Sequence, residues 1–132
     1  MSLVVDASVL VEILLKTPVG RAAVPLLADQ AAAAPDIVDS EVAQALRRAR
    51  RRGGLDDDQL TTALGVLADW PLARVPTRLL VPRSRRWWAN VSVYDSLYLA
   101  VAASRDARVL TCDGPLSRAP GTGVPVENLR VS

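Results

Sequence analysis

Four carboxylates are the side chains of this sequence that are best placed to do chemistry: Asp6, Glu41, Asp95 and Asp113. Each one follows an apolar strand-like segment or lies on the apolar face of a helix-like segment, where a carboxylate costs free energy unless something pairs with it. The chain has no histidine and one cysteine, which excludes most acid–base machinery and nearly every zinc or copper site. The chemistry that remains is a carboxylate cluster around a hard cation such as Mg²⁺ or Mn²⁺.

Three of these acids also have simple structural explanations when each is taken alone. Asp6 could cap the helix that follows it, and Asp113 could open a turn with the glycine after it. Asp95 lies three residues after Ser92, which is the spacing of a capping box. The functional interpretation therefore depends on the four acids being considered together.

Glu41 is harder to explain as a structural residue. It lies four residues from both Ile37 and Ala45, so it shares the apolar face of its expected helix. Asp95 likewise lies three residues before Tyr98 and four before Leu99, so it shares a face with them in an expected helix that is apolar nearly all round.

Such carboxylates must be neutralised, paired or bound to a metal ion. Arginine could pair with each one and give a purely structural network, which remains an alternative. Metal explains the four acids jointly, because bringing like charges together costs free energy unless a cation neutralises them.

The expected elements would place these acids at one end of a sheet. Strands are expected at residues 3–5, 31–34, 70–75, 108–111 and 126–131, and helices at 9–16, 17–29, 35–53, 56–69, 77–89 and 92–103. Strands separated by helices predict an α/β fold with a mainly parallel sheet and helices on both faces. Ligands bind outside the carboxyl ends of such strands, where Asp6 and Asp113 are expected.

Composition limits the class of protein. The 132 residues are half hydrophobic, which predicts one globular domain over residues 1–132 rather than disorder. No apolar run approaches the roughly 20 residues of a membrane span, and the N-terminal segment lacks a basic region typical of a signal peptide. Cys112 has no partner for an internal disulfide, so we expect a reducing, cytoplasmic location and no membrane partner.

Fifteen arginines and one lysine supply the positive charge, and two clusters of arginine stand out. One includes Arg47, Arg48 and Arg51, and the other includes Arg85 and Arg86 beside Trp87 and Trp88. The planar guanidinium suits phosphate and stacks on bases, so these five arginines are candidate RNA contacts. A solvated basic helix end, favoured by the helix dipole, explains either cluster equally well.

Four segments resemble the motifs of PIN-domain nucleases, in the same order and at similar spacing. They are Val4 to Leu10 (VVDASVL), Ser40-Glu41-Val42, Val93 to Ala100 (VYDSLYLA) and Leu110 to Asp113 (LTCD). Chain length and the single-domain form resemble the VapC toxins of bacterial toxin–antitoxin pairs. The loop after Asp113, Gly114 to Ser117, departs from the family because it lacks the frequent second aspartate and aromatic residue.

The resemblance implies a Mg²⁺- or Mn²⁺-dependent endoribonuclease of a type II toxin–antitoxin system. By analogy, Asp6, Glu41, Asp95 and Asp113 would form the catalytic and metal-binding pocket, and Ser8 would support a ligand or bound water. The implied partners are an RNA substrate, for example tRNA or ribosomal RNA, a cognate antitoxin protein and a second copy of the chain. The apolar helix faces near Trp87 and Trp88 are expected at the homodimer interface.

Two other classes of function stay open at this stage. A metal-dependent phosphatase or phospho-acceptor domain also uses acids at strand ends, but it would need a lysine near them. The only lysine, Lys16, is expected at the far end of the first helix. A non-catalytic protein-binding module could keep the same fold, although it would not need all four acids.

Overall fold

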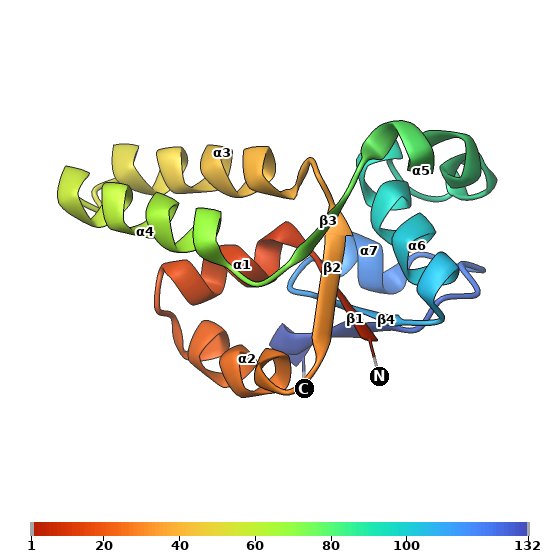
Figure 1. The fold of residues 1–132 in the computed structure, drawn as a ribbon, viewed down its shortest axis with the longest axis horizontal. Coiled ribbons are helices and arrows are strands. Elements are labelled where there is room, and N and C mark those ends of the chain that lie inside the picture. The colour runs from red at the N-terminus through yellow and green to blue at the C-terminus, as the bar shows by residue number, and fades with distance from the viewer. Residues whose placement is uncertain (1, 132) are drawn as a thin grey trace.

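The sheet is five-stranded and entirely parallel. The computed structural model describes residues 2–131. Its strands are β1 (Ser2–Val5), β2 (Ala31–Pro35), β3 (Ala73–Val75), β4 (Arg108–Thr111) and β5 (Val126–Asn128), in the spatial order β3-β2-β1-β4-β5 (Figure 1). In the register of this sheet, Val4 of β1 lies opposite Ala33 of β2 and Val109 of β4.

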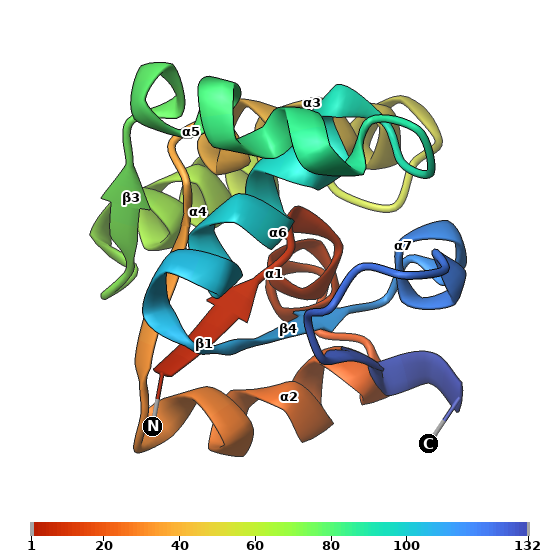
Figure 2. The ribbon, with the colours of Figure 1, turned by 90° about the vertical axis from the view of Figure 1, so that its right-hand side faces the viewer.

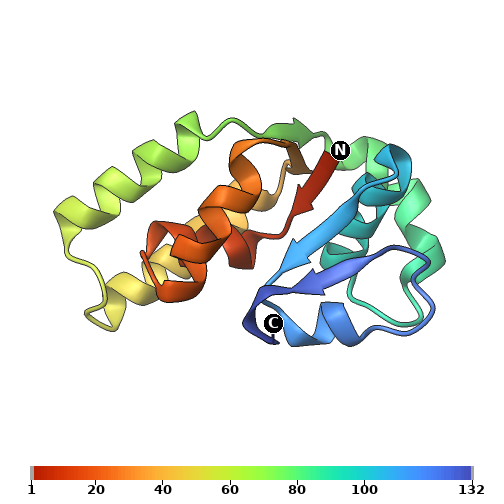
Figure 3. The same ribbon diagram turned by 90° about the horizontal axis from the view of Figure 1, so that it is seen from below.

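Helices cover both faces of the sheet, as the sequence predicts. They are α1 (Ala7–Leu14), α2 (Pro18–Ala28), α3 (Val38–Arg51), α4 (Asp57–Asp69), α5 (Thr77–Ser84), α6 (Val93–Arg105) and α7 (Gly114–Arg118), with short 3₁₀ turns η1 (Arg85–Trp87) and η2 (Leu129–Val131). Figure 3 shows the red to yellow-green helices α1 to α4 on one side of the strands, and the green to cyan helices α5 and α6 on the other. Among residues 2–131, no helix is long and apolar enough to cross a membrane.

The centre of the sheet is the most buried part of the molecule. Leu3, Val4 and Val5 of β1 and Val109 and Leu110 of β4 are fully shielded from solvent. Short, continuous apolar strands of this kind are typical of a parallel sheet that is covered on both faces. The two strands whose ends carry Asp6 and Asp113 are therefore held rigidly by the core.

The chain reverses its direction of winding between β1 and β4. The crossovers β1-α1-α2-β2 and β2-α3-α4-β3 move toward one edge, and the β3-α5-α6-β4 crossover returns past β1 on the other face. Figure 2 shows β1 running into α1, with β4 beside it and α6 alongside. Ligands of open α/β sheets bind at such a reversal, outside the carboxyl ends of the strands. The fold thus marks this end of β1 and β4 as the place to look for a site.

A close crossing of α1 and α2 depends on Gly20. A Cβ atom at this position would lie 2.1 Å from the carbonyl oxygen of Glu12. Any side chain here would push α2 away from α1. The contact fixes the first two helices against each other and supports the helix that begins directly after Asp6.

Two expected boundaries around the long third helix and the last strand were wrong. Residue 35 was expected to open a helix, but Pro35 ends β2 and is buried, and α3 begins at Val38. A proline at a strand end is tolerated because its missing amide is not needed by the ladder. At the C-terminus the expected strand 126–131 is only Val126–Asn128, followed by the turn η2.

Other differences lie around β3 and after β4. The strand expected at 70–75 is shorter, Ala73–Val75, and the helix expected at 77–89 ends at Ser84 and tightens into η1. Proline 82 within α5 removes a helical hydrogen bond close to this change. No helix was expected between the last two strands, yet α7 makes that crossover and lets β5 pair parallel to β4. Two parallel strands need such a crossover.

Candidate active site

Asp6 directly follows β1 and is almost completely buried, with 6% of its surface exposed. Its side chain makes no capping bond to α1. One carboxylate oxygen, Oδ2, instead accepts hydrogen bonds from the hydroxyl of Ser8 at 2.5 Å and from that of Thr111 at 2.9 Å. Asp6 thus occupies the expected N-cap position of α1, but its carboxylate is engaged by the two hydroxyls and not by a capping bond.

The hydroxyls of Ser8 and Thr111 join the ends of β1 and β4. Ser8 Oγ accepts the backbone N–H of Cys112 at 2.9 Å, and Thr111 Oγ1 accepts that of Asp113 at 2.8 Å. The backbone N–H of Asp6 also donates to the carbonyl of Leu110 at 3.0 Å. Because each hydroxyl accepts from a backbone amide and donates to Asp6, both donors are directed at the carboxylate.

Burial raises the pKa of Asp6, and the nearby Asp113 carboxylate raises it further. The hydrogen bonds from Ser8 and Thr111 act in the opposite direction, because they favour the charged form. Asp6 is thus an acid whose charged form is opposed by burial and by Asp113, and favoured by the hydroxyls of Ser8 and Thr111 and by the backbone of Ser8.

Glu41 lies in the first turn of α3 and reaches toward α6. Its Oε1 accepts a hydrogen bond of 2.6 Å from the hydroxyl of Tyr98, whose side chain is fully buried. Burial raises the pKa of Glu41, the Tyr98 hydroxyl lowers it, and the charge of Asp6 raises it. The pKa of Tyr98 is raised above its ordinary value by burial and by Asp6 and Glu41. Tyr98 therefore stays a hydrogen-bond donor at any physiological pH.

Asp95 lies in the first turn of α6, where the side chain of Ser92 caps the helix by accepting its backbone N–H at 3.1 Å. The Ser92 contact of the expected capping box is thus confirmed. Burial, followed by the charges of Asp113, Asp6 and Glu41 in that order, raises the pKa of Asp95 to about 6, against the lowering effect of a hydrogen bond with Ser92. All four candidate acids therefore lie within electrostatic reach of one another.

Among the residues that the structure describes, no arginine or lysine forms an ion pair with these four acids. In residues 2–131 the ion pairs are Arg50–Asp57, Arg74–Asp39, Arg108–Glu127 and Arg130–Glu12, and none includes a candidate acid. The alternative of a purely structural arginine network is therefore not what the described residues form. Lys16 is exposed beyond the far end of α1, away from Asp6, so the lysine expected of a phosphatase-like site is not beside the acids.

The donor set suits a hard divalent cation, which prefers carboxylate oxygens. The raised pKa of Asp95 supports this fit, because a cation would relieve the repulsion that causes part of the shift. Within the part of the chain that is described, no three acidic or sulfur side chains already converge at metal-binding distance. Like charges repel at close range, so the carboxylates would have to turn toward a common point to bind an ion.

The arginines expected to contact RNA are not part of the acid cluster. Arg47, Arg48 and Arg51 are exposed on the outer half of α3, roughly 9–15 Å along the helix from Glu41. Arg85 and Arg86 are exposed in η1, and Arg86 lies 4.5 Å from the ring centre of Trp87.

Trp87 packs within the chain itself, whereas the expected homodimer interface near Trp87 and Trp88 stays a prediction. The side chain of Trp87 is buried, with 4% exposed, and its Nε1 donates to the carbonyl of Thr122 at 2.7 Å. Trp88 beside it is 43% exposed and remains available at the surface.

Thr111 and Tyr98 are two residues of the site that sequence reasoning did not select. Both lie within segments that resemble family motifs. Neither carries a charge at neutral pH, so neither is anomalous on an apolar face in the way that the four acids are. The available signal was position: Thr111 is the polar end of an apolar strand, and Tyr98 lies one turn after Asp95 on the same helix.

Comparisons with known proteins agree with this geometry. The family model described as "PIN domain" matches residues 3–121. Ribonuclease VapC1 of Mycobacterium tuberculosis is 34% identical over 131 residues, covering 96% of this chain and 97% of that protein. Ribonuclease VapC12 of the same species is 30% identical over 125 residues, covering 95% and 97%.

Two solved structures share the fold at low sequence identity. VapBC2 from Rickettsia felis, bound to a DNA fragment from its promoter, matches with a TM-score of 0.64 and 17% identity, covering 97% of this chain and 98% of the other. VapC20 of Mycobacterium tuberculosis, a sarcin–ricin loop cleaving toxin, matches with a TM-score of 0.60 and 17% identity, covering 87% and 92%. The chain belongs to the PIN-domain family and, within it, to the VapC proteins.

Proposed function

We propose that this protein is a divalent-metal-dependent endoribonuclease that acts as the toxin of a toxin–antitoxin pair. One observation carries the proposal: at the winding reversal of a parallel sheet, neighbouring carboxylates of the group help to raise the pKa of Asp6, Glu41 and Asp95. Among residues 2–131, no arginine forms an ion pair with Asp6, Glu41, Asp95 or Asp113. Relatives named ribonucleases, at 30–34% identity over nearly the whole chain, support the assignment.

Asp6, Glu41, Asp95 and Asp113 would hold Mg²⁺ or Mn²⁺. Once bound, such an ion supplies an activated water and stabilises negative charge on the phosphate that is cleaved. The chain's own residues prepare this place. Ser8 and Thr111 orient Asp6 through hydrogen bonds of 2.5 and 2.9 Å, and Tyr98 orients Glu41 through one of 2.6 Å. Such supporting contacts fix the direction of metal-binding groups.

The substrate is RNA, and the partner is an antitoxin protein. The VapC20 relative is described as cleaving the sarcin–ricin loop, which makes structured RNA, including tRNA and ribosomal fragments, the class to test first. The VapBC2 structure holds both members of such a pair, which supports a partner protein for this chain. We further propose that residues 1–132 act as one domain, in the cytoplasm, as a homodimer.

A cleavage assay on a panel of tRNAs and ribosomal RNA fragments tests the proposal. We expect the wild-type protein to cleave at least one of these RNAs in Mg²⁺ or Mn²⁺ and none in EDTA. Asp95→Asn should abolish cleavage, because it removes one of the four carboxylates.

Asp106→Asn is the matched control for this variant. Asp106 is an exposed aspartate that ends the same helix in a left-handed conformation, which asparagine also tolerates. It should retain wild-type cleavage. Full activity of Asp95→Asn, or activity that persists in EDTA, would contradict the proposed function.

A further inference from the structure

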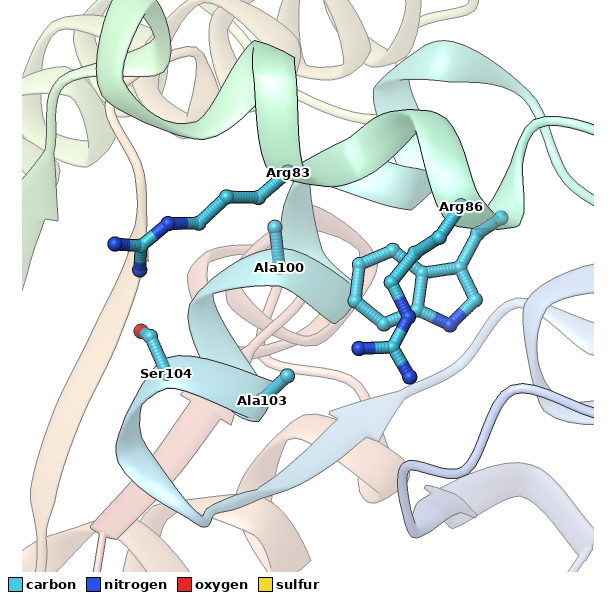
Figure 4. Close-up of a pocket in the computed structure, with 6 residues that line it drawn as sticks. Arg83, Arg86, Ala100, Ala103 and Ser104 are labelled. Carbon is cyan, nitrogen blue, oxygen red and sulfur yellow. The ribbon is translucent and has the colours of Figure 1, made fainter.

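A cavity of about 330 Å³ lies between the end of α5 and the C-terminal half of α6, away from the four acids. Its lining comprises Arg83, Arg86, Trp87, Ala100, Ala103 and Ser104, and we refer to it as the arginine cavity. Figure 4 shows Arg83 and Arg86 descending from the upper helix on either side of the space above Ala100, Ala103 and Ser104. No acidic residue lines it.

The two arginines are arranged to act together. They lie three residues apart, which places them on one face of the helical segment formed by α5 and η1. Both are exposed, and neither takes part in the ion pairs found among residues 2–131. Two positive charges on one face, without an acid beside them, attract an anion.

Arg86 is held in place before any ligand arrives. Its guanidinium lies 4.5 Å from the ring centre of Trp87, which is a favourable cation–π distance. Trp87 itself is buried and fixed by its hydrogen bond to the carbonyl of Thr122. An arginine whose side chain is already positioned loses less conformational entropy when it binds.

Small residues keep the cavity open. Ala100 and Ala103 provide a floor without long side chains, and the Ser104 hydroxyl donates back to the carbonyl of Val101 at 2.8 Å. A larger residue at position 103 would fill the space between the arginines. The shape, the charge and the forked donors of arginine suit a phosphate group.

The arginine cavity and the acid cluster lie on the same helix. Asp95 is in the first turn of α6, and Ala103 is eight residues further, about 12 Å along the helix axis. This separation is the span of a few nucleotides, so an RNA strand whose scissile phosphate lies at the acids can reach the cavity. Because residues 96–102 of α6 are buried, the strand would pass beside α6 and not along it.

We propose that the arginine cavity binds a backbone phosphate of the RNA substrate at a distance from the bond that is cleaved. The inference rests on the proposed function in taking RNA as the substrate. Contacts to phosphate position the strand and do not read its sequence. The cavity would therefore set how tightly the RNA is held, whereas the acids carry out the chemistry.

Binding of a fluorescein-labelled 12-nucleotide oligouridylate, measured in EDTA at several salt concentrations, tests the cavity without any cleavage. We expect Arg83→Gln/Arg86→Gln to weaken binding about 10-fold and to reduce the slope of log affinity against log salt by about 0.7, the value for one phosphate of a single strand. Ala103→Leu should weaken binding without changing charge. Arg21→Gln, an exposed arginine on α2, is the control and should bind more tightly than the double variant.

A second readout uses an RNA that the wild-type protein cleaves. The double variant should raise KM and leave kcat unchanged, because the cavity holds the strand and does not touch the reacting atoms. Unchanged melting temperatures would show that the variants are folded. A loss of kcat alone, or binding equal to that of Arg21→Gln, would overturn the proposal.

The outcomes separate this inference from the proposed function. Arginine-dependent binding without cleavage of any RNA would refute the nuclease and support the cavity, whereas cleavage with unaffected binding and KM would refute the cavity alone. If the arginines are needed to bind a polyglutamate peptide but not the oligouridylate, the cavity serves a protein partner and the proposal is wrong.

Discussion

The two ends of helix α6 contrast in both charge and construction. At its N-terminal end, Asp95 lies near three other carboxylates that are buried or half-buried, and hydroxyl groups hold two of them, Asp6 and Glu41, by hydrogen bonds. Toward its C-terminal end, α6 forms the floor of a cavity flanked by two exposed arginines. The core strands and helices hold the negative charges in place, although their burial costs free energy. The positive charges are exposed to solvent, and their positions follow from their spacing on one helical segment and from the contact of Arg86 with Trp87.

This contrast indicates what each end can do. Buried like charges resist one another, so their arrangement persists only because β1, β4, α3 and α6 hold the residues there. Carboxylates that the fold holds together against their mutual repulsion are suited to bind a cation. Exposed arginines cost little to place, so they suit a weaker and less selective contact with phosphate. The contrast separates chemistry at the acids from holding of the strand at the arginines, and substitutions among the acids and their hydroxyl partners test the first of these roles.

The largest effect is expected from Asp6→Asn. Cleavage should fall to the level without protein, because the most buried carboxylate is lost. In EDTA the variant should melt at a higher temperature than wild type, because burial and Asp113 both oppose the charge of Asp6. Melts should also show that Mg²⁺ stabilises wild type but not the variant. Equal stabilisation of both proteins by Mg²⁺ would contradict the assignment of Asp6.

Thr111→Val should lower activity by roughly 10–100-fold, the usual effect of losing a group that orients a metal ligand. It removes the donor to Asp6 and leaves the backbone N–H of Asp113 without its acceptor. The stability cost of such an orphaned donor is about 1–3 kcal/mol, measurable by urea unfolding.

Thr122→Val is the matched control for this substitution. Thr122 is also largely buried, and its hydroxyl bonds only to the backbone of Val124. This variant should lose stability and keep its activity. Similar activity losses in both variants would mean that Thr111 is merely structural.

Tyr98→Phe should have a smaller effect, up to about 10-fold on activity, because Glu41 keeps its place on α3 and loses one donor. The stability cost of the hydrogen bond should be about 0.5–1.5 kcal/mol. Tyr94→Phe is the control, since its side chain is 63% exposed. Steady-state cleavage kinetics of the two variants should differ, and equal rates would remove Tyr98 from the site.

The smallest effect concerns the pH dependence of stability in EDTA. The folded pKa of Asp95, about 6, lies above its ordinary value of 3.8, so the folded state binds more protons than the unfolded state between these values. The contribution of Asp95 to the free energy of unfolding should therefore be fully present below pH 4 and be lost as the pH rises through 6. The expected loss is roughly 1–2 kcal/mol after allowance for solvent screening. Urea unfolding should show a shallower fall for Asp95→Asn, and an identical fall would contradict the coupling of the four acids.

The fold could be predicted because the elements that define it depend on short-range features of the sequence. Apolar runs such as Leu3 to Val5 and stop signals such as Gly53-Gly54 are short-range features, and the mainly parallel sheet with helices on both faces is confirmed. Helix α7, which was not predicted, has only five residues and no apolar periodicity, so the sequence gives no helical pattern from which to predict it. Pro35 was misplaced because a proline before a helix looks the same whether it starts that helix or ends a strand.

The site was only partly predictable for a different reason. The acids could be selected because a carboxylate on an apolar face is anomalous in sequence, and their functional roles remain a prediction. The contacts that orient them were not predictable, because Thr111 lies 105 residues from Asp6 and Tyr98 lies 57 residues from Glu41. A hydroxyl at a buried strand end gives no signal until the fold shows what it faces.

End-group analysis of the cleaved RNA, in Mg²⁺ and in EDTA, tests the central claim most directly. The chain has no histidine to serve as general base for the RNA 2′-hydroxyl, and its clustered carboxylates suit metal-assisted attack by water. The account predicts 5′-phosphate and free 3′-hydroxyl ends in Mg²⁺ and no products in EDTA. Cyclic 2′,3′-phosphate ends, or cleavage that persists in EDTA, would contradict the roles given to Asp6, Glu41, Asp95 and Asp113.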